Sequence, residues 1–289
     1  MKTADAYLGE DPVGMAGSRA GLWWKDTPVL NGERIGTIGD FSARDGAEAK
    51  HLLDEACDLL REQGCRTAVG PMNGNTWAAH RFVIESDGRA PFLLEPQNPP
   101  GHPGWWEGAG FSVLSRYSSS AMPLDGIDVI PPAVTQRLLR SGVMVRTLDP
   151  ARYDEELRTI HALSLKCFAG NFLYTPLPEE AFLGAYRKIR ERVDADLVRI
   201  AERDGVACGF IFGLPDERAV IVKTLAVDPE ARCAGLGSLL VDGLHRSGLE
   251  KGFSEAIHAL QHETNTSLKI TGRHHGKVFR SYALFAKPL

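Results

Sequence analysis

One stretch of this 289-residue chain constrains its fold more than any other, because a strand, a glycine turn and a helix follow one another within it. The strand-like run RAVIVKTLAVDP leads into a turn that reads Arg232-x-x-Gly235-x-Gly237. Apolar side chains then recur at the spacing of one buried helical face, namely Leu236, Leu239, Leu240 and Leu244. The polar residues expected to face water on this helix are Asp242, His245 and Arg246. This succession indicates an α/β fold with helices packed on a mixed sheet.

The turn has the chemistry of an anion site. Gly235 and Gly237 remove two side chains where the chain enters the helix, so several backbone N–H groups can converge on one anion. Arg232 adds a permanent positive charge. A dinucleotide-binding fingerprint would need a third glycine where Leu240 stands, and a P-loop would need a lysine directly after Gly237. The turn therefore predicts a pyrophosphate site that belongs to neither of these two classes.

The segments around this turn indicate two domains. Residues 143–289 read as strand, helix, helix, three strands, helix, strand, helix and strand, in that order. Residues 126–142 hold a Pro pair and a short helix-like stretch, and we expect them to form a linker. Residues 1–125 contain a clear amphipathic helix at 46–64, flanked by strand-like runs. The predicted domains are therefore 1–125 and 143–289.

The combination of strand, turn and helix resembles the acetyl-CoA motif of the GNAT N-acetyltransferases, written Gln/Arg-x-x-Gly-x-Gly/Ala. The resemblance covers residues 143–289 and implies a mostly antiparallel central sheet flanked by helices, acetyl-CoA as the co-substrate, and no metal. The residues that would hold the pyrophosphate and pair with the pantetheine amides are Leu225, Ala226, Val227, Arg232, Cys233, Ala234, Gly235, Leu236, Gly237 and Ser238. Asn265 matches the position that usually touches the pantetheine arm, and the role of a helix N-cap stays open beside it.

The first domain carries a degraded copy of the same skeleton. TIGDFSARDGAEAKHLL aligns with TLAVDPEARCAGLGSLL, and Asp45 and Glu48 then stand in the places of Arg232 and Gly235. Carboxylates at these positions would repel a pyrophosphate. We therefore expect residues 1–125 to form a GNAT-like domain that has lost its CoA site, with an unrelated α/β domain as the alternative.

Acylation of an amine by a thioester needs a neutral amine, a polarised carbonyl and a stabilised leaving thiolate. The resemblance implies that a backbone N–H near Leu225–Val227 polarises the carbonyl, and that a Glu or His near the sheet centre takes the amine proton. His262 and Glu263 are the two candidates for this base, at the end of the strand-like run SEAIHALQHE. His262 titrates near neutral pH, whereas Glu263 would need burial to raise its pKa. The choice stays open, as does the role of plain strand-end residues.

The acid that protonates the leaving thiolate is harder to identify. Many GNAT enzymes place a Tyr shortly after the Asn, but Thr271, Gly272 and Arg273 occupy those positions here. Tyr282 on the last strand is the nearest substitute, with core packing as the alternative. The acceptor pocket is expected in the loop between the first two helices of the second domain, where the candidate residues are Phe168, Asn171, Phe172 and Tyr174. These aromatic side chains suggest a partly apolar acceptor.

Composition narrows the partners. The formal net charge of −4 argues against nucleic acid as a partner. The sequence contains no run of 18 apolar residues, so we expect no membrane span. The opening residues MKTADAYLGEDPVG lack the apolar core of a secretory signal, so we expect a cytoplasmic protein. The leading hypothesis is an acyl-CoA-dependent N-acyltransferase that moves acetyl to a primary amine of a small molecule or peptide. A non-catalytic CoA sensor or interaction protein is the alternative, and the sequence leaves the acceptor and the oligomeric state open.

Overall fold

The computed structural model describes the residues 3–9, 17–125 and 130–289. The prediction that the opening residues lack a secretory signal rests partly on residues 1–2 and 10–16, which lie outside the described residues. The first four residues of the predicted linker, 126–129, also lie outside them. Everything that follows concerns the described residues.

The chain divides into two compact units. The first unit comprises Met1–Tyr117, Asn171–Thr175 and Arg280–Leu289, and the second unit comprises Ser118–Gly170 and Pro176–Phe279. The units differ from the predicted domains, because two segments from the C-terminal half belong to the first unit. Helix α3 (Pro132–Arg140), which falls within the predicted linker, belongs to the second unit.

The second unit is built on a mixed sheet. Its antiparallel strands are β8 (Val143–Thr147), β9 (Val198–Arg203), β10 (Val206–Asp216) and β11 (Ala219–Val227). The strand β12 (Glu255–His262) pairs with β11 in parallel. The other helices of this unit are α4 (Tyr153–Phe168), α5 (Glu179–Arg187), α6 (Leu236–Glu250) and α7 (Leu268–Arg273). The predicted α/β class and the predicted order of strands and helices are confirmed.

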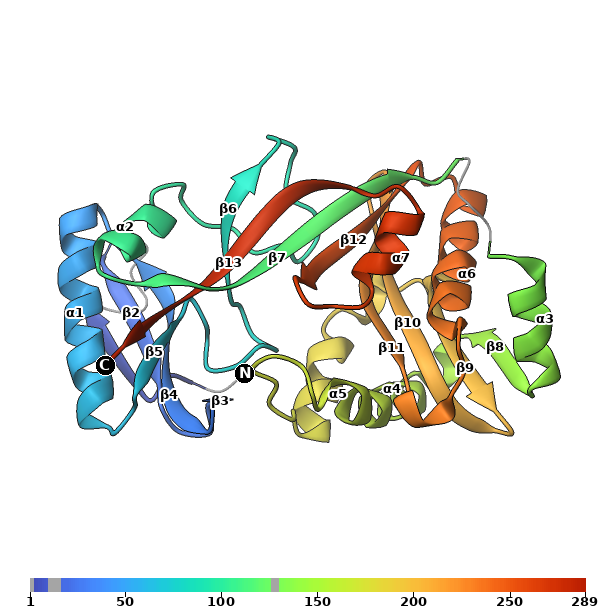
Figure 1. Cartoon of the computed structure of the whole chain (residues 1–289), viewed down its shortest axis with the longest axis horizontal. Coiled ribbons are helices and arrows are strands. Elements are labelled where there is room, and N and C mark those ends of the chain that lie inside the picture. Colours follow the sequence, from blue (N-terminus) through green and yellow to red (C-terminus); the bar gives the residue numbers. More distant parts are fainter. Residues whose placement is uncertain (1–2, 10–16, 126–129) are drawn as a thin grey trace. The chain divides into compact units, whose positions relative to one another are not determined.

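Helix α6 connects β11 to β12 and packs against β10 and β11 (Figure 1). Its apolar side chains face the core as predicted, with full burial of Leu236, Leu240 and Leu244. The prediction that Asp242 and His245 face water is wrong, since their exposed fractions are 3% and 0%. His245 contacts His258 of β12 and His274 just after α7. The buried face of α6 is therefore wider than its leucine stripe, because a second layer of chain covers it.

The first unit repeats the strand–helix–strand crossover of the second. β4 (Glu33–Ser42) pairs in parallel with β5 (Thr67–Gly70), and α1 (Gly46–Glu62) connects them. The remaining elements are β1 (Ala6–Gly9), β2 (Arg19–Trp23), β3 (Val29–Leu30), β6 (Phe82–Ser86) and α2 (His102–Gly108). β1 pairs antiparallel with β2, and β2 with β4, as in the antiparallel part of the second unit. The fully buried core side chains include Ile38, Leu53 and Trp106.

Two long strands are shared between the units. β7 (Ser112–Pro123) runs from the first unit into the second, and β13 (Lys277–Pro288) runs from the second into the first. Within the first unit, β13 pairs antiparallel with β5 and β6. Arg280 and Tyr282 are buried there, and both hydrogen-bond to the carboxylate of Glu95. The last strand therefore completes the sheet of the first unit, although the sequence placed it in the second domain.

The helices are of moderate length. α1 has 17 residues and α4 has 16, and both carry charged side chains on their exposed faces. Within the ranges that the structure describes, no helix is both long enough and apolar enough to cross a bilayer.

Candidate active site

The parallel strands β11 and β12 separate at the centre of the second unit. Their register runs from Ala219 opposite Glu255 to Val222 opposite His258, and both strands continue beyond that last pair. The register between β10 and β11 shifts at the same level, because neighbouring residues of β10 pair with Val222 and with Thr224. Lys223 is thus the extra residue of a β-bulge, which bends a strand away from its neighbour. The bulge accounts for the separation of the two strands.

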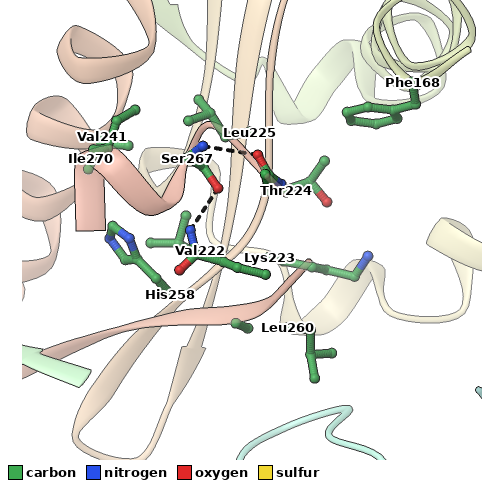
Figure 2. A pocket seen from close by; sticks show the side chains of 13 residues that line it. Phe168, Val222, Lys223, Thr224, Leu225, Val241, His258, Leu260, Ser267 and Ile270 are labelled. Atoms are coloured by element: carbon green, nitrogen blue, oxygen red, sulfur yellow. Dashed lines mark hydrogen bonds between the residues drawn. The ribbon is translucent and has the colours of Figure 1, made fainter. Parts of the chain in front are cut away.

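A cavity of about 160 Å³ lies where the strands part. Its walls come from β11, β12, α4, α6 and the segment around α7: Phe168, Val222, Lys223, Thr224, Leu225, Val241, His258, Ala259, Leu260, Gln261, Asn265, Ser267 and Ile270. Figure 2 shows Phe168 on one side of the cavity and Val241 with Ile270 on the other, with the strand residues between them. The cavity is therefore lined by apolar and polar side chains in about equal measure, and such a mixed lining can both bury and orient a small molecule.

The predicted anion turn leads from β11 into α6. Arg232 and Gly235 both have positive φ, at 49° and 90°, and Gly235 is the N-cap of α6. A Cβ on Gly235 would lie 2.6 Å from Cγ1 of Val134, so the fold itself requires glycine there. A Cβ on Gly237 would meet its nearest neighbour, Cδ1 of Ile270, at an ordinary 3.5 Å. Packing within the protein therefore explains Gly235 but does not explain Gly237.

Three arginines surround the start of α6. Arg137 donates from Nη2 to the carbonyl oxygen of Ala234 at 2.6 Å, and Arg273 donates from Nη1 to Oγ of Ser238 at 3.0 Å. Arg232 is exposed on the turn itself. Within the described residues, none of the three forms an ion pair with a carboxylate. Three positive charges at a helix N-terminus make this turn a strong site for a multiply charged anion.

The equivalent helix of the first unit holds its own anion. Asp45 caps α1 by accepting from the backbone N–H of Glu48 at 2.9 Å. The carboxylate of Glu48 accepts from the side chain and the backbone N–H of Arg44. These hydrogen bonds from Arg44 lower the pKa of Glu48 to about 2. Protein carboxylates therefore occupy the helix N-terminus that corresponds to the turn of the second unit.

A buried histidine pair lies behind the cavity wall. Nε2 of His258 lies 3.1 Å from Nε2 of His245, and Nδ1 of His258 lies 2.7 Å from Oγ1 of Thr271. Oγ1 of Thr271 also lies 2.9 Å from Oε1 of Gln261, so His258 belongs to a buried hydrogen-bond network. Burial holds the pKa of His258 well below its usual range and lowers that of His245 to about 3. His258 is therefore neutral, with both ring nitrogens already bonded.

The predicted catalytic residues lie in different places. His262 ends β12, and its Nδ1 accepts from the backbone N–H of Thr264 at 3.2 Å. Glu263 follows it and is exposed. Neither residue is among those that line the cavity, although they are the next two residues after the wall residue Gln261. Tyr282 has no exposed surface and donates to Glu95 inside the first unit, so it serves core packing there.

The predicted acceptor and pantetheine residues are brought together only in part. Phe168 lines the cavity, as do Leu225 and Asn265. Oδ1 of Asn265 accepts from the backbone N–H of Ser267 at 3.0 Å, so Asn265 also fixes the turn before α7. The other predicted acceptor residues are Asn171, Phe172 and Tyr174. They lie in the segment Asn171–Thr175, which belongs to the first unit. Tyr174 packs there against Trp77, whose Nε1 donates to the carbonyl of Thr175 at 2.8 Å.

Sequence reasoning missed two kinds of site residue. Lys223 carries the only charge within the apolar run AVIVKTLAV, and that charge is the sequence signal for its special position. Arg137 comes from a helix far from the turn in sequence, and nothing in the local pattern of α3 indicates its contact with Ala234. Among the residues that the structure describes, no group of three or more His, Cys, Asp or Glu side chains is placed to hold a metal ion.

Comparison with known proteins places these features in context. Residues 157–269 match the model of the acetyltransferase (GNAT) family. A Caulobacter vibrioides protein named bacterial ceramide synthase is 27% identical over 192 residues, which cover 66% of this chain and 50% of that protein. A GCN5-related N-acetyltransferase from Sphaerobacter thermophilus gives a TM-score of 0.58 at 13% identity, covering 94% of this chain and 76% of that one. A tandem GNAT protein from the clavulanic acid biosynthesis pathway gives 0.53 at 14% identity, with 94% and 78% covered.

These similarities differ in reach. The chain spans about half the length of the curated relatives it matches. The likeness to the two solved structures extends over nearly the whole chain, and at such low identity it concerns the fold. Because each alignment covers 94% of this chain, the likeness in fold includes both units and not only the unit that carries the turn.

Proposed function

We propose that the second unit, whose residues 157–269 match the acetyltransferase (GNAT) family model, is an acyl-CoA-dependent N-acyltransferase of that family. The donor is acyl-CoA, with acetyl-CoA as the first candidate, and the acceptor is a primary amine of a small molecule or peptide. The first unit is a GNAT-like partner without a CoA site of its own. We assign the reaction to the second unit because it has both the glycine turn and the cavity between separated strands, whereas carboxylates occupy the corresponding helix start in the first unit.

The observation that carries this proposal is the turn before α6. Its three arginines lack carboxylate partners within the described residues, and Gly237 is smaller than protein packing requires. A pyrophosphate explains both facts at once, because it supplies the missing negative charge and needs the space beside Gly237. The residues that would hold it are the predicted set from Arg232 to Ser238, joined by Arg137 and Arg273.

The separated strands suit the remainder of the donor. Backbone groups of β11 beyond the bulge, at Leu225–Val227, offer the edge on which pantetheine amides can pair, and Asn265 lines the same cavity as Leu225. A backbone N–H of this strand would polarise the thioester carbonyl. The attacking amine must lose a proton, and His262 and Glu263 remain the candidates because they directly follow Gln261. His258 is unsuited to that role, because both of its ring nitrogens are bonded.

The acyl group needs a test of its own. The cavity of about 160 Å³ suits a short acyl chain, which favours acetyl. A relative is named a ceramide synthase, so longer acyl donors belong in the same experiment. We therefore expect acetyl-CoA to be used in preference to long-chain acyl-CoA, and the reverse order would reassign the donor while keeping acyl transfer.

The experiment that tests the proposal measures the release of free CoA thiol with a panel of primary amines, and identifies the product by its mass. Calorimetric titration with acetyl-CoA runs beside it. Thiol release that depends on an amine, together with an acylated product, is the expected result. Binding of acetyl-CoA without turnover on a broad panel would support the CoA-binding sensor instead, and the absence of binding would overturn both.

A further inference from the structure

Lys223 is the one charged side chain among the residues that line the cavity. It is the extra residue of the bulge in β11, and it is half-buried. Its position is therefore fixed by the same irregularity that separates the two strands. Figure 2 shows its side chain extending from the strand toward the side of the cavity on which Phe168 lies.

The partners of Lys223 are aromatic. Nζ donates to the hydroxyl of Tyr186 at 3.2 Å and lies 5.2 Å from the centre of that ring. Tyr186 is buried on α5, where its ring packs against Phe182 and Phe212. Within the described part of the second unit, Lys223 forms no ion pair with a carboxylate. A packed cluster of aromatic side chains thus holds the ammonium group at the cavity without neutralising its charge.

An ammonium group that is half-buried without a counter-ion loses hydration free energy, and a bound anion restores it. The pyrophosphate of the donor already has three arginines at the other end of the β11 segment, beyond Val227. Lys223 stands instead at the start of that segment, where the strands part. The anion that would pair with the ammonium group of Lys223 is therefore expected on the acceptor.

We propose that Lys223 selects acceptors in which an anionic group, a carboxylate or a phosphate, lies close to the primary amine. This inference rests on the proposed N-acyltransferase function. The cation pairs with the anionic group and holds the acceptor at the cavity, while the apolar walls contact its carbon skeleton. The same charge disfavours the ammonium form of a nearby amine, so it promotes the neutral form that attacks the thioester. Polycationic acceptors are disfavoured by repulsion.

The test compares amines that differ only in the anionic group. An amino acid is paired with its carboxamide, and phosphoethanolamine with ethanolamine, so that the two pairs separate carboxylate from phosphate recognition. The full chain is used with saturating acetyl-CoA, and kcat/KM is measured for each amine. Lys223→Met and Lys223→Arg are compared with Lys188→Met, which removes the same charge from the exposed end of α5.

We expect the wild type to prefer the anionic member of at least one pair by about tenfold or more. In Lys223→Met that ratio falls to about one, in Lys223→Arg part of it returns, and in Lys188→Met it stays at the wild-type value. A Lys223→Met variant in which both members of each pair fall equally would overturn the proposal, because it would indicate a role in the acyl-transfer step or in folding. A wild-type preference for neutral or cationic amines would overturn it as well.

Failure of the selectivity can be told apart from failure of the proposed function. Calorimetry with acetyl-CoA reports the donor site, which Lys223→Met should leave within about twofold of the wild-type Kd. If acetyl-CoA binds but no amine in the panel reacts, equilibrium binding of the same pairs decides. Preference for the anionic member that disappears in Lys223→Met supports the proposal, and equal binding of both members contradicts it.

Discussion

Val222 on β11 and His258 on β12 form the last residue pair of the parallel ladder, and both line the cavity that opens beyond them. The bulge at Lys223 follows directly, so pairing ends where the strand changes direction. The reaction site of the proposed enzyme thus lies where β11 and β12 lose their parallel pairing.

The arginines at the start of α6 should each contribute to donor binding. We expect Arg273→Ala and Arg137→Ala to weaken acetyl-CoA binding about five- to tenfold each, because each removes roughly 1 kcal/mol of charge-assisted interaction. Calorimetry at low and high salt measures this, and the difference from wild type should shrink as salt screens the charges. Arg140→Ala on the same helix α3 is the matched control and should bind normally. A loss in Arg140→Ala equal to that in Arg137→Ala would contradict the assignment.

Stoichiometry tests the role of the first unit. Asp45 and Glu48 occupy the N-terminus of α1 with carboxylates, and the low pKa of Glu48, about 2, keeps its charge at any physiological pH. We therefore expect one acetyl-CoA per chain in a calorimetric titration. The variant Glu48→Gln should leave that value unchanged. Two equivalents per chain would show that the first unit binds the donor despite its carboxylates.

The histidine pair predicts loss of stability in mild acid. The pKa of His245 is about 3, and burial also holds the pKa of His258 well below its usual range. Both therefore lie below the value of about 6.5 for histidine in the unfolded chain. Their contribution is complete above pH 6.5 and is lost as the pH falls toward the folded pKa, since the unfolded chain takes up protons first. Each histidine should cost about 1.4 kcal/mol per pH unit in that window.

Urea unfolding at pH 7.5 and pH 5.5 measures this effect. His245→Gln should reduce the difference between the two conditions by about 1 kcal/mol, because one shifted group is removed. His51→Gln on the exposed face of α1 should leave the difference unchanged. An unchanged difference in His245→Gln would show that the pair does not titrate as its burial implies.

The buried pair of Arg280 and Glu95 should hold the last strand in the first unit. Their side chains are 4% and 1% exposed, so removal of one charge leaves the other buried without a partner. We expect Glu95→Ala to lower the free energy of unfolding by about 3–5 kcal/mol. The double variant Glu95→Leu/Arg280→Met should lower it by less, because it leaves no unpaired buried charge. Chemical denaturation measures both, with Glu85→Ala at an exposed position of β6 as the control. A double variant as unstable as Glu95→Ala would contradict this account.

The sequence predicted what depends on local pattern. The spacing of Leu236, Leu240 and Leu244 identifies α6, and the glycines before it identify the turn. Long-range relations escaped it, because nothing in a helical period shows that a second layer will cover His245. The partner of β13 escaped for the same reason, since the pairing of Phe285 with Gly70 joins segments from opposite ends of the chain.

The bulge is an intermediate case. A charged residue within AVIVKTLAV indicates that the strand is not uniformly buried, but register against β10 decides that Lys223 is the extra residue. The contact of Arg137 with Ala234 depends on how α3 packs and has no local signature. The glycine turn before α6 was therefore predictable from local pattern, whereas the residues that shape the cavity had to be observed.

The central claim is that the turn before α6 binds the pyrophosphate of acyl-CoA, and calorimetric titration of Gly237→Glu with acetyl-CoA tests it most directly. A Cβ at this position makes only an ordinary contact, so the fold should persist, while the added carboxylate repels the pyrophosphate. Leu249→Glu, near the other end of the same helix, is the matched control. We predict that binding falls by about 100-fold or more in Gly237→Glu and is unchanged in Leu249→Glu. A folded Gly237→Glu protein that binds acetyl-CoA as tightly as the wild type would contradict the account.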